Sequence, residues 1–279
     1  MSASLRPDLA VTRVRHELKR RSLRVARVTH LTPHLVRVTL EGEELSDFIS
    51  ASFDDHVKVF FPSTERGAGE AGVPAPLPVA RDFTPRRYDR EARELDLEFA
   101  LHDAGPASAW AAGAQPGQDL IVGGPRGSFV IPTAFDWHIL VGDDTALPAI
   151  ARRLEELPAG SRAFAVVEVD DESGTIPFDT RASLSCSWVY RDGAGGATPG
   201  SARATPGSTA ATQNDALLQA VRALPRLAGE GYVWAAGEAA QIRAIRSYFV
   251  TERGIDKSRI RAASYWKRGA AAVHENIED

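Results

Sequence analysis

The run of residues 81–89, RDFTPRRYD, carries several side chains suited to holding an anionic, partly aromatic ligand. Arg81 and Arg86 supply guanidinium groups, Phe83 supplies an aromatic ring and Thr84 a hydroxyl. Alternation along a strand puts Arg81 and Phe83 on one face and Thr84 and Arg86 on the other. A loop or bulge at the proline after Thr84 is therefore needed to bring the four together. Taken alone, the run is equally compatible with a half-exposed strand whose charges are solvated.

A second segment with binding potential lies some twenty residues further on and begins GPASAW. Its small residues Gly105, Ala107 and Ser108 stand where a short helix is expected to begin. The N–H groups and dipole of a helix N-terminus can hold a pyrophosphate without any basic side chain. The alternative for this segment is a plain capped helix that follows a strand.

Two strand-to-helix turns in the second half of the chain form a third group of candidates. VGDDTALPAI places Asp143 and Thr145 at one turn, and AAGE places Gly237 and Glu238 at the other. Ligands lie at such turns in open α/β sheets. However, neither turn carries a G-x-G-x-x-G motif. Asp143 and its neighbour Asp144 are equally compatible with plain helix N-caps.

Three cations come from distant parts of the chain: Lys58 in HVKVFFP, Arg126 in GPRG and Lys267 in YWKRG. Each by itself is expected to be a solvated surface charge, since most Lys and Arg side chains are exposed. The net charge of the whole chain is -4. That value argues against a nucleic-acid-binding surface spread over the molecule, but it is compatible with a small basic pocket.

Composition narrows the class further. The chain has 279 residues, of which 43% are hydrophobic and 25% charged, as is usual for a globular protein of two domains. A single cysteine, Cys186, excludes an intrachain disulfide and a metal site built from several thiolates. The seven histidines form no HExxH motif, and His56 and His138 are expected to be structural or surface residues. Charges run through the N-terminus and no long apolar run follows, so we expect a cytoplasmic protein without stable membrane association.

The elements that must position these residues change character near Thr133. Six short runs rich in β-branched and aromatic residues precede it, which predicts an antiparallel barrel or sandwich in a domain of residues 1–133. After it, apolar strands alternate with helices, including helices expected over 215–227 and 238–253, which predicts a mostly parallel α/β domain of residues 134–279. Residues 193–214 have almost no large apolar side chains and are expected to form a flexible surface loop.

The order of the motifs carries a family resemblance. Arg-x-aromatic-Thr followed by a Gly- and Ser-containing helix start resembles flavoproteins of the ferredoxin-reductase-like class. HVKVFFP, RDFTPR, LHxAGPASxW, PGxxLxxxGPRGSF, GDxTALPAIARRLEELP, AAGE and YWKRG stand in the order expected of siderophore-interacting proteins. The resemblance implies an N-terminal, six-stranded, FAD-binding β-barrel and a C-terminal, nicotinamide-binding-like α/β domain.

By the same resemblance, FAD and its phosphates would be contacted by seven residues of the first domain. These residues are Arg81, Phe83, Thr84, Arg86, His102, Ala107 and Ser108. Phe83 stands where tyrosine is frequent in the wider class, so it keeps the ring wall but lacks a hydroxyl hydrogen bond. The nicotinamide nucleotide would lie beside the two turns described above, at Asp143, Thr145, Gly237 and Glu238.

The resemblance also implies an activity. Lys58, Arg126 and Lys267 would form a basic cluster beside the flavin that attracts anionic ferric siderophores, chiefly of the catecholate type. The protein would then be an FAD-dependent ferric-siderophore reductase that releases iron as Fe(II), with NADPH, NADH or a ferredoxin as electron donor. No side chain needs to act as a nucleophile or general base, because the flavin carries the electron transfer.

Two other functions remain open at this point. One is a generic flavin or ferredoxin-type reductase with a different acceptor, which would lack a basic pocket of siderophore size. The other is a siderophore-binding module that has lost flavin or donor binding and reduces nothing. The intact RDFT and GPAS segments argue against the binding module.

Overall fold

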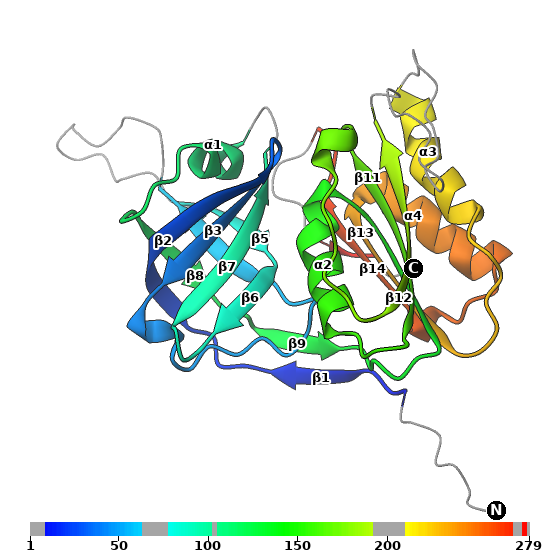
Figure 1. Ribbon diagram of the computed structural model, residues 1–279, viewed down its shortest axis with the longest axis horizontal. Coiled ribbons are helices and arrows are strands. Elements are labelled where there is room, and N and C mark those ends of the chain that lie inside the picture. The colour runs from blue at the N-terminus through cyan, green and yellow to red at the C-terminus, as the bar shows by residue number, and fades with distance from the viewer. Residues whose placement is uncertain (1–8, 63–77, 102–104, 192–209, 270–274, 278–279) are drawn as a thin grey trace, which may run out of the picture. The chain divides into compact units, whose positions relative to one another are not determined.

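The computed structural model describes residues 9–62, 78–101, 105–191, 210–269 and 275–277 (Figure 1). The chain divides into two compact units. The barrel unit is Arg13–Val130, and the α/β unit is Ile131–Asp279 together with Met1–Thr12.

The barrel unit is built on one curled antiparallel sheet of seven strands. Its strands are β2 (Arg20–Thr32), β3 (Leu35–Glu41), β4 (Val57–Phe61), β5 (Val79–Phe83), β6 (Pro85–Asp89), β7 (Glu94–Ala100) and β8 (Asp119–Gly123). Their hydrogen-bonded order is β5, β4, β8, β2, β3, β7, β6. A short helix, α1 (Pro106–Ala112), precedes β8, and β1 (Thr12–Arg15) pairs with β9 (Gly127–Val130) in a separate two-stranded sheet.

Strict alternation of apolar residues explains how this sheet encloses a core. Val36, Val38 and Leu40 of β3 and Leu95 and Leu97 of β7 are fully buried. Because successive side chains of a strand point to opposite faces, one face of each strand supplies the core. Phe48, Phe61 and Phe99 belong to the same core cluster, and Phe83 and Trp110 pack against it.

The strand count differs from the expected six because residues 81–89 supply two strands in place of one. The edge strands β5 and β6 lie at opposite ends of the hydrogen-bonded order, yet only Thr84 separates them in the chain. Pro85 has no N–H group to donate to a ladder, which favours a break at this point. The sixth expected run, SFVIP, lies outside the sheet as β9. A single residue thus links the two edges of the curled sheet.

The α/β unit contains a six-stranded sheet in the order β12, β11, β10, β13, β14, β15. Its strands are β10 (Trp137–Asp143), β11 (Arg162–Val169), β12 (Ser183–Tyr190), β13 (Gly231–Glu238), β14 (Ile260–Trp266) and β15 (Glu275–Asn276). The first five are parallel, and β15 is antiparallel to β14. The helices are α2 (Leu147–Glu156), α3 (Ala210–Arg222) and α4 (Ala239–Ser247), and α4 continues into a π-helical turn, Tyr248–Glu252.

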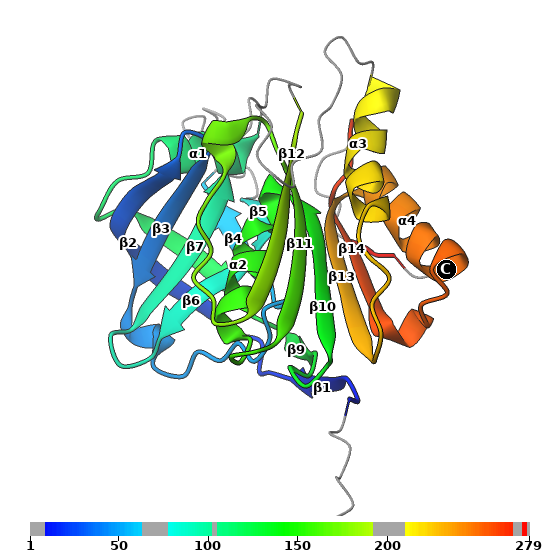
Figure 2. The ribbon, with the colours of Figure 1, turned by 45° about the vertical axis from the view of Figure 1, so that its right-hand side comes forward.

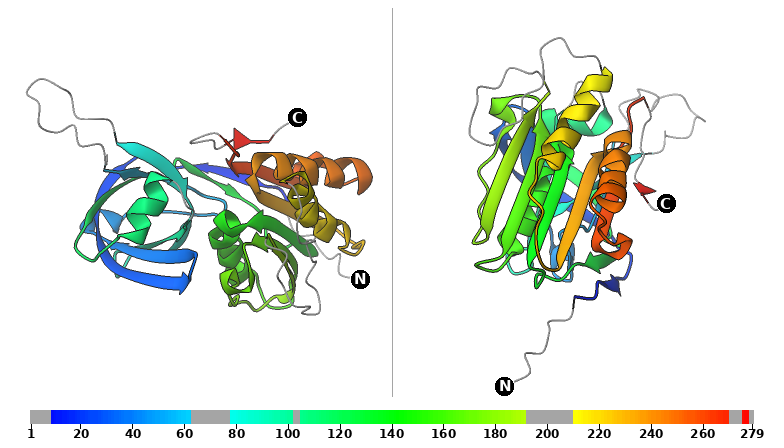
Figure 3. Two further views of the ribbon diagram at one scale, coloured as in Figure 1. Left: turned by 90° about the horizontal axis from the view of Figure 1, so that it is seen from above. Right: turned by 90° about the vertical axis from the view of Figure 1, so that its right-hand side faces the viewer.

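Helices cover both faces of this sheet, α2 on one and α3 with α4 on the other (Figures 2 and 3). The chain runs outward from β10 through β11 to β12, and then returns to the other side of β10 for β13 and β14. The connections that leave β10 and β13 therefore diverge, and a crevice at such a switch point is where open α/β sheets bind ligands.

The expected loop over residues 193–214 was wrong at its C-terminal end. Residues 193–209 lie outside the described part of the chain, but α3 begins at Ala210, five residues before the start that the sequence suggested. The segment AATQND is helical although it has no large apolar side chain, so its polar composition did not indicate a lack of helix. Among the described residues, no helix combines the length and the apolar character that crossing a membrane requires.

Candidate functional site

The side chains expected to hold a ligand lie around the point where β5 passes into β6. Thr84 and Arg86 are both buried there. Pro85 and Arg87 lie opposite consecutive residues of β7, so Arg86 is the extra residue of a β-bulge. A bulge redirects the side chain that it inserts. The irregularity needed for convergence is therefore present directly after Pro85.

Arg86 lies beside a buried carboxylate. Its Nε is 3.5 Å from Oε1 of Glu98, and Nε of Arg37 donates a hydrogen bond to the same oxygen at 3.0 Å. Glu98 is 4% exposed. Two guanidinium groups therefore lie beside one buried carboxylate. Glu98 was not anticipated from the sequence, because ELDLEFALH reads as an ordinary alternating strand.

Arg81 and Phe83 share the inner face of β5. They lie opposite Val59 and Val57, which are fully buried core residues of β4. The ring of Phe83 packs 4.5 Å from the ring of Phe99, at an interplanar angle of 44°. Phe83 remains only partly buried, and Arg81 is half-buried with Nη1 donating to the carbonyl of its neighbour. The aromatic wall expected at Phe83 thus belongs to the edge of the barrel core.

Helix α1 begins beside the same aromatic cluster. The ring of Trp110 lies 5.6 Å from the rings of both Phe61 and Phe99, and Ala107 packs against the same core. Oγ of Ser108 donates to a carbonyl at the end of β7 at 3.4 Å. The RDFT and GPAS segments, far apart in the sequence, therefore meet at one cluster. The predicted contact His102 lies outside the described residues.

The N-terminus of α1 is suited to an anion. Gly105 provides no side-chain cap, and the first turn contains no acidic residue. Its φ of +149° is one that only glycine adopts readily, and a Cβ added there would find no atom within 4 Å. The backbone dipole at this helix start favours negative charge.

The three expected substrate cations are all exposed. Nζ of Lys58 pairs with Oδ1 of Asp82 at 2.7 Å, across the β4–β5 ladder. Arg126 follows β8, and its carbonyl accepts a hydrogen bond from the N–H of His16 at 3.0 Å. Lys58 and Arg126 belong to the barrel unit, whereas Lys267 belongs to the α/β unit. The pairing with Asp82 was missed because strand register cannot be read from the sequence.

The two turns predicted to face a nicotinamide meet at the carboxyl ends of β10 and β13. Oδ1 of Asp143 accepts a hydrogen bond from the N–H of Thr145 at 3.0 Å, and Oδ2 accepts one from the N–H of Glu238 at 3.2 Å. Gly237 makes this approach feasible, since a Cβ there would lie 2.7 Å from Oδ2 of Asp143. Nε1 of Trp266 also donates to Oδ2, at 2.7 Å. Asp143 is thus a helix cap and a link between three strands.

Carboxylates outnumber cations at this edge of the sheet. Arg191, directly after β12, lies 3.0 Å from Asp144, 3.0 Å from Glu168 and 2.7 Å from Asp170. Burial lowers the pKa of Arg191, but the charges of Asp144, Asp143 and Glu168 outweigh burial and raise it overall. Burial, and then the charge of Asp144, raises the pKa of Asp143. Arg191 was not anticipated from the sequence, because SWVYR is typical of an ordinary strand with a charged end.

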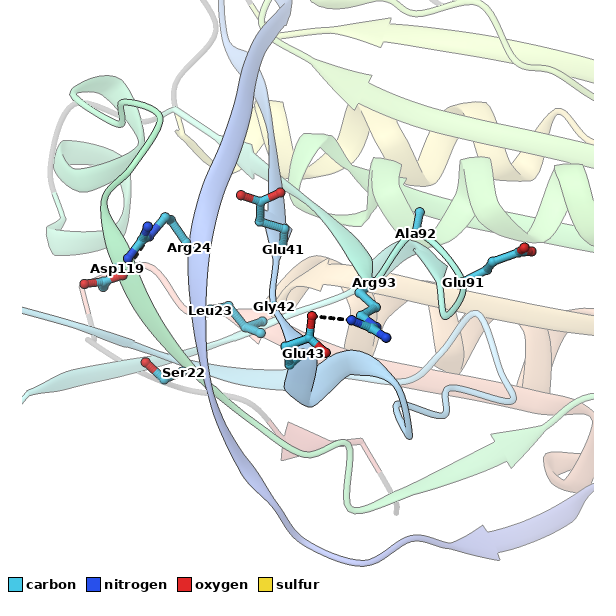
Figure 4. Close-up of a pocket in the computed structure, with 10 residues that line it drawn as sticks. All are labelled: Ser22, Leu23, Arg24, Glu41, Gly42, Glu43, Glu91, Ala92, Arg93 and Asp119. Atoms are coloured by element: carbon cyan, nitrogen blue, oxygen red, sulfur yellow. Dashed lines mark hydrogen bonds and ion pairs between the residues drawn. The ribbon is translucent and has the colours of Figure 1, made fainter.

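A pocket of about 470 Å³ lies elsewhere on the barrel unit (Figure 4). Its charged lining consists of Glu41, Glu43, Glu91, Asp119, Arg24 and Arg93. Arg93 pairs with Glu43, and Nε of Arg24 lies 3.5 Å from Oδ1 of Asp119. None of the expected ligand residues lines it, and its surplus of carboxylates repels phosphates and anionic chelates. We therefore do not assign it to the functional site.

Comparison with known proteins agrees with the two-unit organisation. Residues 24–129 match the model of the siderophore-interacting FAD-binding domain, and residues 135–269 match that of the siderophore-interacting protein. The NADPH-dependent ferric-chelate reductase of Escherichia coli is 34% identical over 91% of this chain and 95% of its own length. The ferric vibriobactin reductase of Vibrio cholerae is 32% identical over 91% and 93%.

Solved structures extend the comparison. A siderophore utilization protein from T. fusca superposes with a TM-score of 0.81 at 37% identity, covering 95% of this chain and 98% of that one. The ferredoxin reductase of carbazole 1,9a-dioxygenase, at 16% identity and a TM-score of 0.62 over 91% of this chain and 69% of that one, shares the fold alone. By its domain models and by relatives that align over almost their whole length, this chain belongs to the siderophore-interacting protein family.

Proposed function

We propose that this chain is an FAD-dependent ferric-siderophore reductase that takes electrons from NADPH and releases iron as Fe(II). One observation carries the proposal: Phe83 of the RDFT segment and Trp110 of the GPAS helix both pack against Phe99. All three lie in the unit that matches an FAD-binding domain. The names of the Escherichia coli and Vibrio cholerae relatives support reduction of a ferric chelate.

The residues of the barrel unit fit FAD. A flavin dinucleotide needs a flat apolar contact for its ring and positive or N–H groups for its pyrophosphate. Phe83 and Thr84 offer a ring and a hydroxyl, and Arg81 and Arg86 offer guanidinium groups. The start of α1, which has no acidic residue in its first turn, offers a helix dipole. The guanidinium group of Arg86 is buried, so its attraction for a phosphate would be weakly screened.

Bound FAD would supply the chemistry that the side chains lack, because it accepts two electrons together and passes them on singly. The protein's own part is to bind FAD, to orient its ring and to neutralise the charge of its phosphates. Arg81 and Arg86 would hold the phosphates of FAD, with Ala107 and Ser108 beside them at the start of α1. Phe83 and Thr84 would contact and orient the flavin ring. His102 remains a proposed member of the same site. Reduction weakens the hold of hard oxygen ligands on iron, which releases it from the chelate.

Lys58, Arg126 and Lys267 are proposed to attract an anionic ferric siderophore of the catecholate type. All three are exposed, so their charges are accessible to a large ligand. Lys58 is partly neutralised by Asp82, and an incoming anion would compete for its ammonium. Exposed cations raise the local concentration of anions even when the whole protein is negative.

The nicotinamide nucleotide is proposed to lie at the carboxyl edge of the parallel sheet, beside Thr145, Gly237 and Glu238. Asp143 would act there through the hydrogen bonds that shape the turn. The surplus of carboxylates at this edge makes tight binding of a phosphate-rich nucleotide difficult, which predicts a weak, transient encounter. A ferredoxin is the alternative donor. We further propose that the protein acts in the cytoplasm, where reduced nicotinamides are available.

An anaerobic absorbance titration tests the proposal. Purified protein should show flavin bands, which bleach with NADPH and return when a ferric catecholate is added, while a ferrous trap reports Fe(II). Since NADPH delivers two electrons and Fe(III) accepts one, two equivalents of Fe(II) should form per NADPH. If flavin is present but only a reduced ferredoxin bleaches it, the donor assignment is wrong. If the protein does not bind added FAD, the reductase proposal fails.

A further inference from the structure

The end of β14, which leads into the exposed residues 267–269, is held by contacts to two other strands. Gly237 lies opposite Ser264 and Glu238 opposite Trp266, so Tyr265 is an extra residue in the β13–β14 ladder. The ring of Tyr265 packs edge-on against Trp234 at 6.2 Å, with an interplanar angle of 78°. The irregularity rotates the strand end, so that the next side chain can reach across the sheet.

That next side chain, Trp266, is tied to the other side of β13. Its indole Nε1 donates to Oδ2 of Asp143 at 2.7 Å. Asp143 is 1% exposed and receives further hydrogen bonds from the N–H groups of Thr145 and Glu238. A buried carboxylate with donors on several sides cannot rotate freely, so it provides a fixed anchor for the indole.

A second carboxylate holds the chain two residues later. Oε1 of Glu238 accepts a hydrogen bond from the N–H of Arg268 at 3.3 Å. Its other oxygen, Oε2, caps α4 by accepting from the N–H groups of Ala240 and Gln241 at 2.7 and 3.1 Å. Glu238 is buried, so its two oxygens serve two purposes at once. The helix start and the segment after β14 are fixed by one side chain.

Lys267 therefore stands between two anchored neighbours while its own side chain is exposed. We propose that Asp143 and Glu238 are positioning residues that, through the indole of Trp266 and the backbone of Arg268, hold Lys267 where it contacts the anionic ferric chelate. The inference rests on the proposed function. Asp143 and Glu238, which were expected to contact the nicotinamide, would then also help to bind the ferric chelate. The same two carboxylates would link the nicotinamide site to the chelate site.

The physical reason is the flexibility of lysine. Its ammonium sits on a four-carbon stem, so its mean position depends on where the backbone starts and how much that start moves. Fixing the residues on both sides lowers the entropy lost when the ammonium meets its ligand. Removing one anchor should weaken the attraction for an anion without changing the flavin site.

Trp266→Phe tests this directly, since it keeps a ring but removes the N–H donor. Steady-state reduction would be measured with NADPH and two probes, an anionic ferric tricatecholate and an uncharged ferric trihydroxamate. We expect KM for the anionic chelate to rise roughly fivefold, with kcat and KM for the uncharged chelate near wild type. Trp266→Tyr, whose hydroxyl can donate to Asp143, should stay closer to wild type than Trp266→Phe.

Trp188→Phe is the matched control, because it makes the same change on β12, where Trp188 stacks on Phe178. It should leave both KM values unchanged. A double-mutant cycle then links Trp266 to Lys267: in a Lys267→Ala background, Trp266→Phe should have no further effect on KM, since the group being positioned is gone.

Several results would overturn the inference. The first is an equal rise in KM for both chelates in Trp266→Phe, and the second is an equal rise in KM for Trp266→Phe and Trp266→Tyr. The other two are fully additive effects of Trp266→Phe and Lys267→Ala on KM, and no effect of Lys267→Ala by itself. In each case the wild-type protein would still reduce ferric chelates, so only the positioning role would fall. If the wild-type protein bound no FAD or reduced neither chelate, the proposed function itself would fail, and this inference with it.

Discussion

Nε of Arg86 lies 3.5 Å from Oε1 of Glu98, and their side chains are only 8% and 1% exposed. The pair joins the bulged residue of β6 to its neighbour β7, next to the point where the chain links the two edges of the curled sheet. Removal of one partner from a buried ion pair strands the other charge away from water, which costs far more than loss of an exposed pair.

Glu98→Gln is therefore expected to lower the free energy of unfolding by about 3 kcal/mol. The amide keeps the shape of the carboxylate but leaves the guanidinium groups of Arg86 and Arg37 without its charge. Urea denaturation, followed by circular dichroism, would measure the change. Glu94→Gln is the control on the same strand, because its partner Arg27 is 55% exposed, and it should cost less than about 1 kcal/mol. Equal losses for the two variants would contradict the importance of burial.

Gly237→Ala is expected to destabilise the α/β unit by about 3 kcal/mol. The new Cβ would lie 2.7 Å from Oδ2 of Asp143, and φ is +150°, so close contact and backbone strain act together. Gly254→Ala separates the two effects, because φ there is +69° but a Cβ would meet nothing within 4 Å. It should cost about 1 kcal/mol. Thermal melts of the two variants give the comparison. A larger loss of stability in Gly254→Ala than in Gly237→Ala would show that the close contact with Asp143 does not limit the residue at position 237.

Stability should fall in mild acid because of His138. Burial, together with the charge of Arg153, lowers the pKa of its imidazole from 6.5 to about 4 in the folded protein. Between these values the unfolded chain binds a proton that the folded chain does not, so stability is complete above pH 6.5 and is lost as pH falls toward 4. The loss amounts to roughly 3 kcal/mol at about 1.4 kcal/mol per pH unit.

Unfolding midpoints at a series of pH values would measure this effect. His138→Gln, which keeps a donor for the carbonyl of Thr133, should flatten the acid limb of the profile. His30→Gln, at an exposed position of β2, should leave it unchanged. An unaltered acid limb in His138→Gln would show that other groups cause the acid sensitivity.

The single thiol should be nearly inert in the native protein. Burial raises the pKa of Cys186 from 9.0 to about 12, so at mildly alkaline pH the reactive thiolate is about a thousandfold rarer than in the unfolded chain. Reaction with a disulfide reagent should accordingly be slow until denaturant is added. Rapid labelling of native protein, without a change in melting temperature, would contradict this description of the site.

Much of this protein could be predicted from local sequence. Alternating apolar residues indicated a β-rich first half, and apolar strands followed by amphipathic helices indicated the α/β second half, because burial imposes a period of two on strands and 3.6 on helices. Pro85 marked the point where the RDFT strand must be interrupted, since proline cannot donate a ladder hydrogen bond. The order of short motifs was enough to suggest the family.

Only the tertiary structure decided which distant groups meet. The contact of Arg86 with Glu98, the pairing of Lys58 with Asp82 and the hydrogen bond from Trp266 to Asp143 depend on strand register and on a bulge. Sequence patterns determine which face of a strand is apolar, but many registers satisfy the same pattern, and a shift changes every cross-strand partner. The sequence by itself therefore determined the kinds of elements and the candidate chemical groups. The pairing register between neighbouring strands determined which of those groups lie together.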